Sequence, residues 1–250
     1  MKKSLLAAAV STAALLVASI CQPPHLSAQE SHAHRHDPSE KLGRVNFSVS
    51  CTPAARKQFN RAVAWLHSFE YEEAEKAFTA VADTDPRCAM AYWGVAMSNY
   101  HSIWAPPTAE ELRKGLAAIE KARSVGARTV RERDYIAAIE VFYRDSDKLD
   151  HRTRTLAYSD AMGRLHRRYP SDHEAGVFYS LTLIAKGMAA GDKTYASEKE
   201  AARILNRVLA RDTRYQRIVL TAWKDDLRLF LNGHLQFSSR DEYRYHEALV

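Results

Sequence analysis

The sequence lacks every short motif that commonly marks a catalytic or phosphate-binding site. It has no glycine-rich phosphate loop, no G-x-S-x-G elbow, no H-E-x-x-H pair and no C-x-x-C pair. These absences argue against a P-loop hydrolase, an α/β-hydrolase, a zinc protease and a dithiol redox protein. His173 and Glu174 are adjacent, but no histidine follows them at helical spacing. The sequence therefore predicts a protein that is not an enzyme.

A long apolar run is also missing. Met1-Lys2-Lys3 precedes an apolar stretch from Leu5 to Ile20, which is too short to span a bilayer comfortably and has no stop-transfer flank. Residues 1–28 are predicted to be a signal peptide cleaved after Ala28, giving a periplasmic or secreted protein with no integral membrane segment. Cys21 raises the alternative of a lipoprotein, which the bulky Ile20 before it disfavours.

Acidic residues are somewhat fewer than basic ones, and the net charge is +6. Loss of Lys2 and Lys3 with the signal peptide leaves 34 basic and 30 acidic residues, a net charge of +4. Arginines gather at residues 164–168 and 203–217, without the interleaved aromatic motif of a nucleic-acid site. They are interpreted as solvated helix faces, and no nucleic-acid partner is expected.

What the sequence does contain is helical periodicity. Residues 29–50, with Pro38 and Gly43, form no sustained period and are interpreted as a His-bearing exposed tail and linker. Beyond them no alternating strand pattern is seen, so the fold class is predicted to be all-α. The helices are expected over residues 53–68, 71–82, 86–100, 109–124, 129–143, 151–169, 173–190 and 197–210.

A small residue followed four positions later by a large apolar one recurs along these helices, at spacings of 41, 46 and 40 residues. This arrangement lets the second helix of a pair pack closely against the first. The pairs are Ala74 and Phe78, Gly115 and Ile119, Ala161 and Leu165, and Ala201 and Leu205.

Residues 69–86 read F-E-Y-E-E-A-E-K-A-F-T-A-V-A-D-T-D-P, which matches the second half of a tetratricopeptide repeat (TPR). With D-P-R-C-A-M-A-Y-W-G and H-S-I-W-A-P-P, the chain resembles exported bacterial TPR proteins over roughly residues 40–215. The resemblance implies a helical-hairpin solenoid of about four degenerate repeats at residues 51–215. Residues 216–250 depart from it and are interpreted as a C-terminal cap, truncated or divergent.

The resemblance also implies a function, that of an exported non-enzymatic scaffold with a protein or peptide partner in its concave groove. The alternative is that the same side chains form the core of a short array. Eight residues are expected to face the groove: Phe59, Val63, His67, Trp93, Met97, Tyr100, His101 and Trp104.

Two cysteines remain after removal of the signal peptide, Cys51 and Cys88. The repeat geometry places both at the same end of neighbouring first helices, and an exported protein meets an oxidising compartment. A disulfide is therefore expected, the alternative being two unpaired thiols packed as small apolar side chains.

Three histidines alternate along the N-terminal tail at His32, His34 and His36. In an extended chain alternate side chains point the same way, so they could converge on one Cu(II) or Zn(II) ion. A periplasmic metal-binding protein is therefore the alternative function, and no other cofactor is expected. A solubilising tail is the simpler interpretation.

Overall fold

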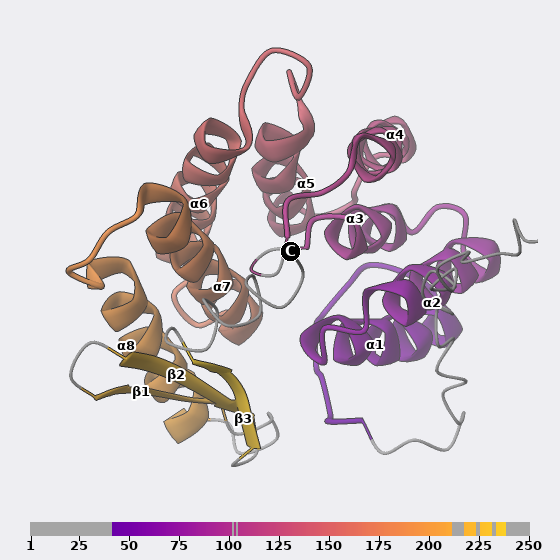
Figure 1. Ribbon diagram of the computed structural model, residues 1–250. Coiled ribbons are helices and arrows are strands. Elements are labelled where there is room, and N and C mark those ends of the chain that lie inside the picture. Colours follow the sequence, from indigo (N-terminus) through magenta and orange to yellow (C-terminus); the bar gives the residue numbers. More distant parts are fainter. Residues whose placement is uncertain are drawn as a thin grey trace, which may run out of the picture. The chain divides into compact units, whose positions relative to one another are not determined.

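The computed structural model describes residues 42–101, 103 and 105–211, and the backbone of three later strands at 218–223, 226–231 and 234–238 (Figure 1). The helices are α1 (Pro53–His67), α2 (Tyr71–Thr84), α3 (Ala89–Ser98), α4 (Ala109–Val125), α5 (Val130–Tyr143), α6 (His151–Arg168), α7 (His173–Ala190) and α8 (Ala196–Arg211). The strands are β1 (Ile218–Trp223), β2 (Asp226–Leu231) and β3 (His234–Ser238). Within the described ranges, none of the helices has the length and apolar character to cross a membrane.

Consecutive helices pack as four hairpins, α1 with α2, α3 with α4, α5 with α6 and α7 with α8 (Figure 1). Neighbouring hairpins meet through α2 and α3, α4 and α5, and α6 and α7. The prediction of an all-α fold is confirmed for the described residues up to Arg211. No helix end there differs from its predicted position by more than three residues, and the largest difference is at the start of α3.

Local sequence explains where several helices begin. Thr108 and Thr129 each start a capping box, in which the threonine side chain accepts from a backbone N–H and Glu111 or Glu132 reaches back. Asp150 and Asp172 cap α6 and α7 through their carboxylates.

The recurring small residues let helices approach closely. Apart from Gly115, which has no side chain, every residue of the small-and-large pairs has a buried side chain in the core. A Cβ atom added at Gly115 would overlap the ring of Tyr143, and one added at Gly94 would overlap the ring of Phe78. Glycine is therefore required at these positions by packing.

We expect Gly115→Ala to lower the free energy of unfolding by about 1–3 kcal/mol, the usual cost of overpacking a core. Tyr143 is fully buried and donates its hydroxyl to the carbonyl of Ala96 at 2.6 Å, so its ring cannot move away without losing that bond. Urea unfolding monitored by circular dichroism measures the change. Arg113→Ala, at an exposed position of the same helix, is the control; equal stability of the two variants would contradict the close contact.

The strands follow the helices as an antiparallel meander in the order β1-β2-β3. Ile218 pairs with Leu231 and Trp223 with Asp226, and the pairing of β2 with β3 shifts register between Leu229 and Phe230 of β2. The prediction of an all-α fold therefore does not extend to this part of the chain. β-Branched and aromatic residues favour strands here, a signal that was missed because the region was treated as a divergent cap.

An extended segment before α1 is packed into the helical core. We call residues 42–52 the strap. Phe47 and Val49 are buried, the Phe47 N–H donates to Asn60 Oδ1 at 2.8 Å, and the Thr52 N–H donates to Asp85 Oδ2 at 2.8 Å. The prediction of an exposed linker through residue 50 is therefore wrong at Phe47 and Val49, because these two apolar side chains in a polar stretch find non-local partners.

Candidate functional site

Most of the residues expected to line a binding groove are core residues. Phe59 and Val63 are fully buried, Trp93 is 1% exposed, and Met97 and Tyr100 are nearly as inaccessible. A partner could not touch them without opening the core. Of the two alternatives left open by the sequence, the structure selects the packing role for these five.

The strap occupies the space in which a peptide was expected. The Phe47 ring lies 5.5 Å from the rings of both Phe59 and Trp93 and 5.0 Å from that of Tyr135, between centroids. These edge-on and tilted contacts are favourable for aromatic side chains. The aromatic surface is thus satisfied by the chain itself.

The two histidines of the predicted groove have partners within the protein. His67 Nε2 lies 2.8 Å from Glu174 Oε2, and its ring stacks on Phe178. His101 Nδ1 lies 3.5 Å from Glu111 Oε1, and its ring packs against Tyr71. Trp104, the remaining predicted residue, lies outside the described residues.

His32, His34 and His36 lie outside the described residues, as does the predicted signal peptide. Among the residues that the structure does describe, no three histidine, cysteine or acidic side chains are grouped so as to hold a metal ion.

Cys51 and Cys88 form a disulfide, with their Cα atoms 5.0 Å apart. Cys51 belongs to the strap and Cys88 directly precedes α3. The bridge therefore fastens the strap to the second hairpin, close to where Phe47 enters the core.

A half-buried ionic cluster also fastens the strap. The Arg131 guanidinium lies over the rings of Phe47 and Tyr135, at 4.6 and 4.9 Å from their centroids. It donates to Asp172 at 2.6 Å and to the carbonyl of Ser48 at 2.8 Å. Tyr135 also donates to Asp172, and burial, followed by the charge of Asp172, raises its pKa. Because the charges in this cluster are paired, we assign it a structural role.

Glu132 adds a buried carboxylate to the contacts of the strap. It accepts from the N–H and the hydroxyl of Ser50, each at 2.6 Å, while also completing the capping box of α5. One carboxylate thus starts a helix and holds the strap.

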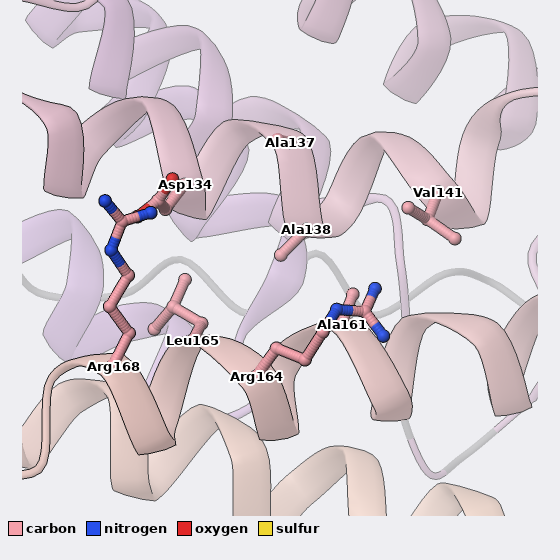
Figure 2. Close-up of a pocket in the computed structure, with 8 residues that line it drawn as sticks. All are labelled: Asp134, Ala137, Ala138, Val141, Ala161, Arg164, Leu165 and Arg168. Atoms are coloured by element: carbon pink, nitrogen blue, oxygen red, sulfur yellow. The ribbon is translucent and has the colours of Figure 1, made fainter.

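A groove lies between α5 and α6 (Figure 2). Its volume is about 280 Å³, and we call it the α5–α6 groove. It is lined by Asp134, Ala137, Ala138, Val141, Ala161, Arg164, Leu165 and Arg168. Figure 2 shows Arg168 facing Asp134 across the groove, with Leu165 and Ala138 directed into the space between the helices. The groove exists because the alanines that line it are small, and its floor is apolar.

The charges in the α5–α6 groove are unevenly paired. Arg168 lies 3.0 Å from Asp134, and Tyr169 donates its hydroxyl to the same carboxylate at 2.6 Å. Burial, and then that hydrogen bond, raises the pKa of Tyr169. Arg164 has no ion-pair partner within the part of the chain that the structure describes. The sequence interpretation of these arginines as a solvated face missed the groove; arginines four apart beside Ala161 and Leu165 were its only signal.

A smaller cavity of about 170 Å³ lies beside α7 and is lined partly by His101 and His151. Burial lowers the pKa of His151, and neighbouring Arg154 lowers it further. Burial, followed by Arg207, similarly lowers the pKa of His166. The His151 ring and the His166 ring each have a buried Nδ1 atom without a hydrogen-bond partner among the described residues.

The lowered pKa values of His151 and His166 predict that the protein loses stability on acidification. Because their folded-state pKa values lie below the ordinary value of 6.5, protonation favours the unfolded chain. The stabilisation is present above about pH 6.5 and is lost as the pH falls through the lowered values. We expect a lower melting temperature at pH 5.5 than at pH 7.5, and a smaller drop in a variant carrying His151→Gln and His166→Gln. An equal drop would assign the effect to other groups.

Comparison with known proteins gives partial relatives. The chain is 58% identical over 71 residues to the polyamine aminopropyltransferase of Leptospira interrogans, which is 28% of this chain and 14% of that protein. It is 59% identical over 70 residues to polyamine aminopropyltransferase 2 of Ralstonia nicotianae, covering 27% and 13%. The enzyme of that name from Mycobacterium tuberculosis is 62% identical over 40 residues, covering 16% and 8%. No family model matches the chain, and neither does any solved structure.

The chain thus spans about a seventh of the length of the first of these relatives. The names overturn the identification as an exported TPR protein and the prediction of a non-enzymatic peptide-binding scaffold, since those relatives are named as transferases. The alternative function, a metal-binding protein, gains no support from them. The prediction failed because the motifs whose absence was used belong to other enzyme classes.

Proposed function

We propose that this chain takes part in the transfer of an aminopropyl group to a polyamine. The observation that carries the proposal is the 58% identity over 71 residues to a polyamine aminopropyltransferase. Segments of 70 and 40 residues with 59% and 62% identity to enzymes of the same name in two other organisms support it. Identity at this level over 71 residues indicates common ancestry for the matched part of the chain.

The experiment is to incubate the full chain with an aminopropyl donor and a polyamine acceptor and to analyse the products by mass spectrometry. We expect an acceptor that is longer by one aminopropyl unit, and polyamine binding in calorimetry. A protein that shows neither transfer nor binding would contradict the proposal. Binding without transfer would limit the chain to substrate recognition.

We further propose that the shared segment includes the strands that follow α8. The shorter matches of about 40 residues have nearly the length of the chain after Arg211. The fold also changes there, from helical hairpins to an antiparallel meander. A different ancestry for the last part of the chain would account for both observations.

Leu229→Pro tests this assignment. Leu229 lies in β2, the central strand, where proline removes a backbone donor and disrupts pairing. We expect loss of polyamine binding and transfer with the helical circular dichroism signal and its melting preserved. Leu229→Val, which keeps a residue that favours strands, is the matched control. Unchanged binding in the proline variant would move the segment into the helices.

For the helical part, we propose four TPR-like repeats, one per hairpin. What supports this is the burial of the small-and-large pairs and the contact of each hairpin with the next. A crystal structure in which the hairpins did not stack in one repeating direction would reject it. Export stays a prediction, because residues 1–28 lie outside the described part.

A further inference from the structure

The α5–α6 groove carries a surplus of positive charge. The Asp134 carboxylate is taken up by Arg168 and by the hydroxyl of Tyr169. Arg164 lines the same groove, is exposed, and has no ion-pair partner among the described residues. A guanidinium can bind a carboxylate through two parallel hydrogen bonds, which is both stronger and more directional than a single contact.

The floor of the groove selects for an apolar body beside the charge. Ala138, Ala161 and Leu165 are buried below it, and Val141 lines one end (Figure 2). A volume of about 280 Å³ lies just below the range of about 300–1,000 Å³ that is usual for ligand pockets. The space therefore suits a small molecule and is too small for a folded partner.

We propose that the α5–α6 groove binds a small carboxylate with a short apolar body. The carboxylate pairs with Arg164, and the hydrocarbon part covers the alanine and leucine floor. A polyamine is excluded by its positive charge, because it would face two guanidinium groups and an acid that is already paired. This inference rests on the groove alone and does not depend on the proposed transferase function.

Hexanoate is the probe for this site, with hexylamine, acetate and inorganic phosphate as comparisons. Chemical-shift titration of the full chain should show saturable binding of hexanoate. Acetate lacks the body and hexylamine reverses the charge, so both should bind at least about tenfold more weakly. Phosphate that bound as tightly as hexanoate would show that only the charge is recognised. Either that result or equal binding of hexylamine would overturn the proposal.

Two variants test the charge and the floor separately. Arg164→Gln should weaken hexanoate binding about tenfold or more, and Arg164→Lys should restore part of it. Arg167→Gln is the matched control, since Arg167 is an exposed arginine of the same helix that does not line the groove. Ala137→Leu adds volume at an exposed position of the lining and should weaken binding with an unchanged melting temperature. Full binding by Arg164→Gln or by Ala137→Leu would place hexanoate elsewhere and reject the site.

Discussion

Replacement of Phe47 by alanine is expected to lower the free energy of unfolding by about 3–5 kcal/mol, the usual cost of truncating a fully buried phenylalanine. The side chain is 1% exposed and lies among four aromatic rings contributed by α1, α3, α5 and α7: those of Phe59, Trp93, Tyr135 and Phe178. Its removal would leave a cavity lined by four helices, each from a different hairpin. These helices cannot all move inward to fill the cavity. It would also take away the aromatic face beneath the Arg131 guanidinium.

Urea unfolding followed by circular dichroism measures this change. Asn46→Ala is the matched control, because Asn46 is the neighbouring strap residue and its side chain is exposed. The control should change stability by less than about 0.5 kcal/mol. A loss below about 1 kcal/mol for Phe47→Ala would mean that the strap is not part of the cooperative core.

The helices could be predicted because their information is local. Apolar spacing, capping threonines and proline or glycine boundaries act within a few residues of each other. That is why the predicted range 109–124 became α4 at Ala109–Val125. The small-and-large pairs are similarly local and were also recognised.

The strap and the interior depend on contacts between distant residues. Phe47 meets Phe178, which is far along the chain, and Ser50 meets Glu132. No spacing rule indicates such pairs. The same aromatic side chains suit a peptide groove and a core, so the pattern of Phe59 and Trp93 alone could not decide between them. The position of Phe47 against both rings shows that they belong to the core.

The α5–α6 groove was missed for a related reason. Arg164 and Arg168 were correctly expected to be exposed. A groove, however, is also formed by the residues of the helix that faces them. Asp134 and Ala138 lie on another helix. The strands were missed because periodicity had been interpreted through a helical resemblance that ends before them.

The disulfide should contribute about 3–4 kcal/mol to stability, because the bridge between Cys51 and Cys88 closes a loop with a sequence separation of 37 residues in the unfolded chain. In the chain-entropy model the gain comes from restricting the unfolded state. The structure adds a folded-state consequence, since the bridge holds the end of the strap against α3 while Phe47 fills the core. Reduction should therefore weaken the anchorage of the strap as well as the closure of the loop.

The measurement compares urea unfolding of the oxidised protein, the reduced protein and a variant carrying Cys51→Ala and Cys88→Ala. The reduced protein and the variant should both lose about 3–4 kcal/mol, and reductant should not change the variant further. Thiol titration of the denatured, unreduced full chain should detect Cys21 alone, because the chain contains three cysteines and two of them are paired. Three free thiols would refute the bridge in solution. One free thiol with no change in stability on reduction would instead show that the core holds the strap without the disulfide. In that case, Phe47→Ala should lower the stability of the reduced protein by more than reduction does.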